Sequence, residues 1–253
     1  MRSLLFAPPD EKRLAEALQS GADAIIVDLA GGAPATRAGG RAAAERFLKR
    51  TRGRGGAPAL IVRAHALDSG ETDADLDAVM ASAPDAILLP GSLGAPSVQQ
   101  LSAKLAVREA QLGLADGATR IIAVADRTQS LFNMGSYRGS SARLWAIAWS
   151  AESLRAEIGA EANRDRFGDA LAPYRLARDL TLFAATSARL AAIDGVFPNI
   201  GDLKGLRAEA LAARRDGFAG KLAVDAAQAA AINEIFPWRA WPSPKAAGKE
   251  PGA

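Results

Sequence analysis

GLRAEALAARRDGFAGKLAVDAAQ, residues Gly205–Gln228, contains one complete copy of the unit from which we expect the whole fold to be built. Its first half has no helix breaker, and its apolar residues fall roughly on one face, as in an amphipathic helix: Leu206, Ala210, Leu211 and Ala213. Gly217 then ends the helix. The run Lys221–Val224 is short and apolar and leads to a carboxylate, Asp225. A helix, a glycine turn and a buried strand are typical of a parallel α/β sheet.

The same unit recurs along the chain. Short apolar runs predict strands at residues 3–7, 24–29, 59–63, 86–89, 121–125, 144–149, 192–197 and 221–224. Helical patterns separate them at residues 10–20, 36–50, 73–82, 96–112 and 205–216, with further helical material between 150 and 189. Eight alternating strands match a TIM barrel, whereas a doubly wound sheet more often has five or six.

The length of the chain fits one barrel as well as two small domains, and we prefer one domain. We therefore predict a TIM (β/α)8 barrel over residues 1–236. Residues 237–253 are rich in proline and have no helical period, so we expect an extended or disordered C-terminal tail.

Composition excludes several kinds of chemistry. The chain has no cysteine, which rules out disulfides, thiol catalysis and thiolate metal sites. The N-terminal stretch MRSLLFAPPD has only five apolar residues before two prolines, which is neither a signal peptide nor a membrane span. We therefore expect a cytoplasmic protein with no membrane partner. The net charge is only +3 and the arginines are scattered, so we expect no nucleic-acid partner.

In a barrel, chemistry occurs where the strands end. Polar residues lie at or just beyond the ends of five of the predicted strands: Asp28, Arg63, Asp126, Glu152 and Asp225. Arg63 is suited to binding a carboxylate or phosphate, and the alternative is an internal salt bridge to Asp28 or Asp126.

The carboxylates of Asp126 and Glu152 provide the hard oxygen ligands that a divalent cation prefers. The alternative is that each pairs with a nearby arginine, Arg127 or Arg155. His65, the single histidine, is either a loop residue or a base for hydrolysis together with Asp28 or Asp126, although no nucleophile-elbow pattern supports a hydrolase.

Six segments together resemble the HpcH/HpaI aldolase and citrate lyase beta-subunit family, in near-colinear order: RSLLFAPPD, SGADAIIVDL, LIVRAHALD, AILLP, AIDGVFPNIGDLKGLRAEA and GFAGKLAVDAAQ. The resemblance implies a TIM barrel that usually forms trimers or hexamers. It also implies magnesium-dependent cleavage or formation of carbon–carbon bonds next to a carboxylate, on thioesters such as citryl-CoA and malyl-CoA. We therefore expect a homo-oligomer, with a trimer favoured.

Several motifs differ from the family pattern. The family's Asp-Leu-Glu-Asp is Asp28-Leu29-Ala30-Gly31 here, its Leu-Pro-Lys is Leu89-Pro90-Gly91, and its His-Pro is Asp225-Ala226. The metal-binding glutamate corresponds to Asp126 and the metal-binding aspartate to Ser153, a neutral residue. Arg63 and Gln228 match, whereas His65 stands in the place of an asparagine.

Two functional readings follow from the resemblance. In the first, the chain is a lyase of the citrate lyase beta-subunit type with an atypical, partly lost Mg2+ site. The expected roles are catalytic for Arg63, Asp28 and Asp225, cofactor-binding for Arg2 and Gln228, and metal-binding for Asp126 and Glu152. In the second, the barrel is catalytically inactive and serves as a binding or assembly partner.

Overall fold

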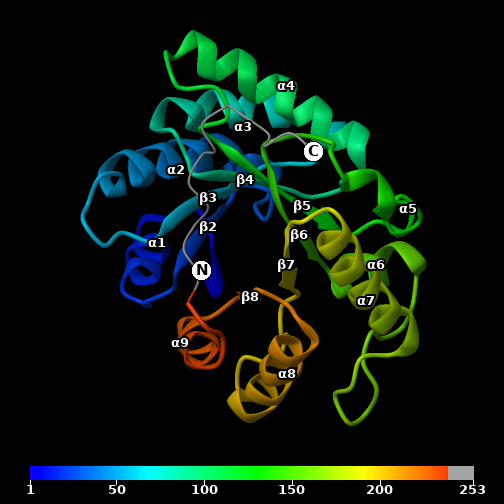
Figure 1. The fold of residues 1–253 in the computed structure, drawn as a ribbon. Helices are drawn as coiled ribbons and strands as arrows, with labels where there is room; N and C mark the ends of the chain where they lie inside the picture. The colour runs from blue at the N-terminus through cyan, green and yellow to red at the C-terminus, as the bar shows by residue number, and fades with distance from the viewer. Residues whose placement is uncertain (239–253) are drawn as a thin grey trace.

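The computed structural model describes residues 1–238. Its eight strands are all parallel and form a closed barrel in sequence order (Figure 1). The strands are β1 (Ser3–Ala7), β2 (Ala24–Asp28), β3 (Ala59–Arg63), β4 (Ala86–Leu89), β5 (Arg120–Ala125), β6 (Leu144–Trp149), β7 (Ala191–Asp194) and β8 (Gly220–Ala223). The predicted TIM barrel is thereby confirmed, while the predicted tail lies almost wholly outside the described residues.

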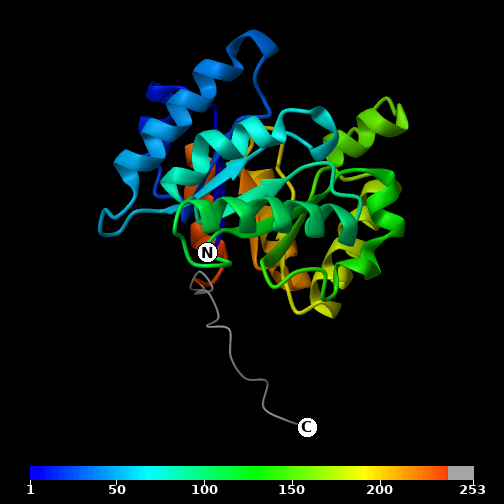
Figure 2. The ribbon, with the colours of Figure 1, turned by 90° about the horizontal axis from the view of Figure 1, so that it is seen from above.

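Helices surround this barrel on its outside, as the two views at right angles show (Figures 1 and 2). They are α1 (Glu11–Leu18), α2 (Arg37–Thr51), α3 (Thr72–Val79), α4 (Ala95–Gln111), α5 (Thr128–Phe132), α6 (Ala151–Ile158), α7 (Ala172–Ser187), α8 (Leu203–Asp216) and α9 (Ala226–Ile235). Short 3-10 turns lie at η1 (Pro34–Thr36), η2 (Leu67–Ser69), η3 (Met80–Ser82) and η4 (Met134–Tyr137). Among residues 1–238, no helix combines the length and the apolar character needed to cross a bilayer.

Local sequence explains where several of these helices begin and end. Asp10 caps α1, because its carboxylate accepts the backbone N–H groups of Lys12 and Arg13 at 3.1 Å. Gly217 ends α8 with a φ of 113°, a left-handed conformation that favours glycine. The unit predicted from residues 205–228 is therefore present as α8 followed by β8.

The core has two layers, because side chains alternate across each strand. One set fills the barrel: Leu4, Ala24, Ile26, Ile61, Leu88, Ile122, Val124, Ala148, Ile193 and Leu222. The other set packs between the strands and the helices, and it includes Ile25, Val62, Ile87, Ala123 and Ile147. This alternation decides which strand-end residues face the interior.

The barrel closes at the β7–β8 seam, where only two positions pair, Ile193 with Gly220 and Asp194 with Lys221. Lys221 is fully buried on the outer side of β8. Its ammonium donates to Asp194 at 2.8 Å, to the Gly195 carbonyl at 2.7 Å and to Glu209 of α8 at 2.8 Å. All three ammonium protons are therefore used, as burial of a charge requires.

Strand β7 is shorter than predicted, ending at Asp194 instead of residue 197. At Gly195 the chain passes so close to Trp149 that a Cβ there would lie 3.2 Å from the indole. The Gly195 carbonyl bonds Lys221. The apolar residues Val196 and Phe197 thus extend the hydrophobic pattern without extending the strand.

Candidate active site

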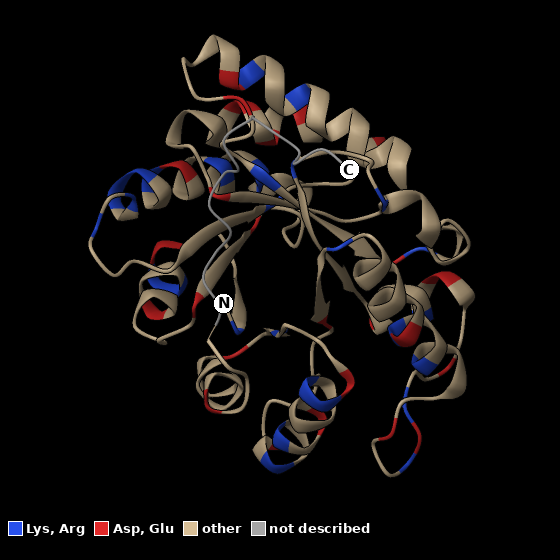
Figure 3. Cartoon of the chain, viewed as in Figure 1, with Lys and Arg blue, Asp and Glu red and all other residues tan. Residues whose placement is uncertain are grey.

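The predicted residues Asp28, Arg63 and Asp126 meet at the carboxyl end of the barrel. Each lies two positions beyond an interior-facing residue, Ile26, Ile61 and Val124 respectively. Because side chains alternate, all three are placed on the interior side of their strands. Most other charged residues lie on the surrounding helices and loops (Figure 3).

Arg63 and Asp28 form an ion pair, with 3.2 Å between Nη1 and Oδ2. The guanidinium also lies 5.8 Å from the centroid of the Phe6 ring. Of the two alternatives for Arg63, the internal salt bridge to Asp28 is present. A guanidinium has five N–H donors in a fork, so this contact leaves donors for a carboxylate ligand.

Asp28 is itself held by its own loop. Its Oδ1 accepts the backbone N–H groups of Ala30 at 3.1 Å and Gly31 at 3.0 Å. A Cβ at position 31 would lie 2.6 Å from Oδ2 of Asp28, so glycine leaves room for this turn. The backbone of Ala30 and Gly31 therefore holds the Asp28 carboxylate in place.

Asp126 is buried, with 6% of the residue exposed. Burial raises the pKa of its carboxyl from 3.8 to about 6, against the opposing effects of the Gly91 N–H and the charges of Arg63 and Arg127. The Gly91 N–H donates to Oδ1 at 2.8 Å. Asp126 is thus a carboxyl group that changes protonation state near neutral pH, a property often found at functional sites.

Glu152 is engaged elsewhere. It lies in the first turn of α6, where Arg155 Nε donates to it at 2.9 Å and Asn163 donates to it at 3.2 Å. The hydrogen bond from Arg155 lowers the pKa of Glu152 below its usual range. The alternative predicted for Glu152, a pair with Arg155, is therefore present.

The donor set around Asp126 offers one carboxylate to a magnesium ion. The hydroxyl of Ser153, where the sequence analysis expected the loss of a metal ligand, contacts the Ser150 hydroxyl at 3.0 Å. Within residues 1–238 there is no group of three or more histidine, aspartate or glutamate side chains arranged to hold a metal. Magnesium sites normally use one or two carboxylates with near-ideal octahedral geometry. Asp126 contributes a single carboxylate that already accepts a backbone N–H.

Asp225 and Gln228 have structural contacts at the start of α9. Asp225 caps this helix by accepting the Ala227 N–H at 2.7 Å. Gln228 is fully buried, accepting the Val224 N–H at 3.1 Å and donating to the Phe197 carbonyl at 3.0 Å. Gln228 thereby joins the loops that follow β7 and β8, and both of its polar atoms are bonded to backbone.

Arg2 lies at the other end of the barrel. It precedes β1, whereas Asp28, Arg63 and Asp126 end or follow their strands, and all the strands are parallel. Its guanidinium pairs with Asp23 at 2.8 Å and donates to the Asn233 carbonyl at 3.0 Å. The structure therefore places Arg2 at the opposite end of the barrel from Asp28, Arg63 and Asp126.

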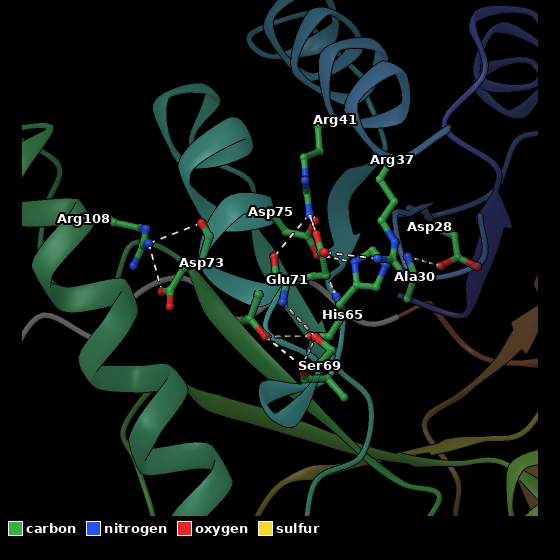
Figure 4. Close-up of polar contacts among 12 residues, drawn as sticks. Asp28, Ala30, Arg37, Arg41, His65, Ser69, Glu71, Asp73, Asp75 and Arg108 are labelled. Carbon is green, nitrogen blue, oxygen red and sulfur yellow. Dashed lines mark hydrogen bonds and ion pairs between the residues drawn. The ribbon is translucent and has the colours of Figure 1, made fainter. Parts of the chain in front are cut away.

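Two further features were not predicted from the sequence. An apolar groove of about 220 Å³ lies outside the barrel between α5, α6 and α7, and none of the predicted site residues lines it. Beside the site, His65 contacts Asp75 of α3, with 2.7 Å between Nδ1 and Oδ2 (Figure 4). The signal for Asp75 was its helical spacing, since Thr72, Leu76 and Val79 share its buried face.

Comparison with known proteins agrees with the fold and the motifs. Residues 2–226 match the family described as HpcH/HpaI aldolase/citrate lyase. The chain belongs to this family. The suspected resemblance to this family is thereby confirmed.

Relatives carry more than one activity in their names. A (3S)-malyl-CoA thioesterase from Cereibacter sphaeroides is 30% identical over 238 residues, covering 93% of this chain and 76% of the relative. A citrate lyase beta subunit from Leuconostoc mesenteroides subsp. cremoris is 28% identical over 181 residues, covering 72% of this chain and 58% of the relative. The chain thus aligns with less than two thirds of that subunit.

Among solved structures, CitE from Mycobacterium tuberculosis in complex with magnesium, acetoacetate and coenzyme A superposes with a TM-score of 0.77. The two are 25% identical, and the match covers 93% of this chain and 80% of that chain. Magnesium therefore occurs in a relative with the same barrel.

Proposed function

We propose that this chain acts on a carboxylated acyl thioester of the malyl-CoA or citryl-CoA class, as a carbon–carbon lyase of the citrate lyase beta-subunit type. The observation that supports this most is the interior grouping of Arg63, Asp28 and Asp126 at one end of the barrel. It combines a cation for a carboxylate with a buried carboxyl group whose pKa is about 6. The thioester class comes from the relatives.

Cleavage needs a base and a site for the electron pair that leaves the broken bond. Ionised Asp126 removes the proton from the hydroxyl group on the carbon next to the scissile bond. The carbon–carbon bond then breaks, that carbon becomes a carbonyl, and the electron pair passes to the thioester as an enolate. The enolate oxygen is stabilised by Arg63 or Arg127. Protonated Asp126 then returns the proton to the enolate carbon. This step forms the acyl thioester product and restores the ionised carboxylate.

Magnesium has no step in this scheme, which uses only the described side chains. We propose that its site is atypical and partly lost. Titration calorimetry with magnesium chloride, with and without malyl-CoA, tests this point. Binding at micromolar concentrations would contradict it, because one carboxylate does not provide such affinity.

The second candidate is an inactive barrel that serves as a binding or assembly partner. It is favoured by three predicted site residues that already have protein partners. Asp225 caps α9, Gln228 bonds to backbone groups, and Glu152 pairs with Arg155. We also propose a homo-oligomer, with a trimer favoured, and a cytoplasmic location. Sedimentation velocity on the purified chain tests the oligomer.

The deciding experiment uses malyl-CoA and citryl-CoA with the purified chain and follows acetyl-CoA by chromatography and mass spectrometry. We expect acetyl-CoA to form, at a rate that rises with pH through about 6, because Asp126 must be ionised. Asp126→Asn should lower the rate by a factor of about 100 or more. Binding of the thioester without acetyl-CoA at any pH favours the inactive barrel, and absence of both binding and cleavage rejects the lyase.

A further inference from the structure

The apolar groove between α5, α6 and α7, which we call the outer groove, leaves large apolar side chains open to solvent. Its volume is about 220 Å³, and its main apolar lining residues are Leu131, Phe132, Leu154, Ile158, Leu176 and Leu180. Phe132 is 90% exposed, Leu176 58% and Ile158 51%. Adjoining apolar side chains with this much exposure are typical of a surface that binds another protein segment.

Helix α7 has apolar residues on two of its faces. Tyr174 and Ala177 are buried toward the barrel, whereas Leu176 and Leu180 line the outer groove. Leu176 and Leu180 are four residues apart, so they form a row along the outer side of the helix. The solvent face of such a helix is usually polar. Packing against the barrel therefore does not account for this outer row.

The outer groove suits an apolar side chain better than a small-molecule ligand. Sites for such ligands usually have volumes of about 300–1,000 Å³ and a few polar groups directed into them. Except for Thr128, the lining residues here have aliphatic or aromatic side chains. The backbone N–H of Thr128 donates to Glu157 of α6, a carboxylate that has no ion pair within residues 1–238. An occupant that combines an aromatic ring with a cation therefore matches the groove and its edge.

The chain itself contains such a segment directly after α9. Trp238 is 66% exposed, and the sequence continues with Arg239, Ala240 and Trp241. Two indoles thus flank one guanidinium. Proline occupies positions 237 and 242 and restricts the backbone, which lowers the entropy lost on binding. Beyond Trp241 the sequence has no further aromatic or large aliphatic residue.

The segment is too short to reach the outer groove of its own barrel. Helix α8 packs against α9 and lies between α9 and α7 around the barrel (Figure 1). Helices in contact have axes about 8–10 Å apart, so α9 and α7 are about 16–20 Å apart. The last turn of α9 also bonds Arg2 at the amino end of β1, whereas α5 and α6 start from the carboxyl ends of their strands. Trp241 follows Trp238 by three residues, a reach of about 11 Å at most, so the occupant comes from a second copy.

We propose that residues 237–241 of one copy bind in the outer groove of a second copy, with Trp241 in the groove and Arg239 paired with Glu157. The inference rests on the homo-oligomer proposed above, and it names the surfaces that join the copies. Because the groove and the segment are different surfaces, the contact is heterologous. Such contacts close into rings when the rotation between copies permits it. A ring of three copies agrees with the favoured trimer.

Disulfide cross-linking tests the contact directly, because the chain has no cysteine of its own. Two single variants, Ala240→Cys and Thr128→Cys, are co-expressed with different tags and then oxidised. Since the two new thiols lie on separate copies, they can be linked only between copies. We expect a covalent dimer that contains both tags, with positions 240 and 128 joined in the peptide map.

A matched control replaces Thr128→Cys with Thr186→Cys. Thr186 is an exposed residue near the end of α7, and it does not line the outer groove. It should give no such dimer above background. Absence of the link between positions 240 and 128, or an equal yield from Thr186→Cys, overturns the contact.

Sedimentation velocity on the full chain measures what the contact contributes to assembly. Trp241→Ala and Leu176→Glu should each weaken self-association by a factor of about 30 or more, as expected for an aromatic anchor and its pocket. Val107→Glu is the control, because Val107 lies on α4 and is 55% exposed. It should leave self-association unchanged. Glu157→Arg and Arg239→Glu should each weaken it by a factor of up to about 5, and the two changes together should restore it.

The outcomes separate this inference from the proposals on which it rests. An oligomer that is unchanged in both Trp241→Ala and Leu176→Glu overturns the contact and leaves the homo-oligomer standing. A chain that stays monomeric at every concentration overturns both. Formation of acetyl-CoA is measured independently of either result and tests only the lyase.

Discussion

Replacing Asp126 with asparagine should stabilise the barrel at neutral pH and not at acid pH. The pKa of Asp126 is raised from 3.8 to about 6 because its carboxyl is buried. Ionisation of Asp126 therefore opposes folding. Its contribution to the free energy of unfolding is largest below about pH 4, where the carboxyl is protonated, and it is lost as the pH rises through about 6. The difference between a pKa of 3.8 and one of about 6 corresponds to about 3 kcal/mol in the free energy of unfolding. Asparagine cannot ionise, and its amide oxygen still accepts the Gly91 N–H.

Urea unfolding followed by tryptophan fluorescence measures this effect, with Trp149 as a buried reporter. The difference in free energy of unfolding between Asp126→Asn and the unaltered chain should grow by about 3 kcal/mol between pH 4 and pH 8. Asp68→Asn is the control, because the side chain of Asp68 is 78% exposed. A difference that stays constant with pH would falsify the raised pKa and, with it, the reason for choosing Asp126 as a base.

Three other substitutions have outcomes that follow from the contacts. Lys221→Met should lower the free energy of unfolding by about 3–5 kcal/mol, because it leaves Asp194 and Glu209 without their shared cation. The control Lys49→Met, which removes an exposed pair, should cost less than about 0.5 kcal/mol, and equal losses would contradict the argument. Asp225→Ala should cost about 1 kcal/mol in thermal unfolding through loss of the α9 cap, and Asp225→Asn should recover most of it; a larger loss in both variants would point to another role. Arg63→Gln should weaken binding of a malyl-CoA thioether analogue by a factor of about 10–100 in titration calorimetry, with only partial recovery in Arg63→Lys, and unchanged affinity would remove Arg63 from the substrate site.

The sequence predicted the barrel closely, and seven of its strands start and end within one residue of their predicted bounds. Buried parallel strands have short apolar sequences between glycine turns. Their positions can therefore be predicted from the neighbouring residues in the sequence alone. The end of β7 is not local, since it depends on Trp149 and Lys221 reaching Gly195. Helix α9 was not predicted separately, because a segment as apolar as Ala226–Ile235 has no distinct polar face.

The site was predicted less completely, for physical reasons that differ by residue. The common position of Asp28, Arg63 and Asp126 follows from strand ends alone. The pairing of Glu152 with Arg155 depends on side-chain geometry within α6, which motif matching does not resolve. The contact of His65 with Asp75 joins a loop to a helix ten residues away, and the sequence patterns did not indicate Asp75 as its partner.

The β7–β8 seam also bears on the order in which the molecule assembles. A nascent chain that has made seven strands holds the carboxylates of Asp194 and Glu209 before their lysine has been synthesised. Their other partners precede β8 in the chain, since Asp194 accepts from Trp149 and Arg178 and Glu209 accepts from Arg164. Strand β8 therefore brings the last backbone pairs of the barrel together with an ammonium that both carboxylates share.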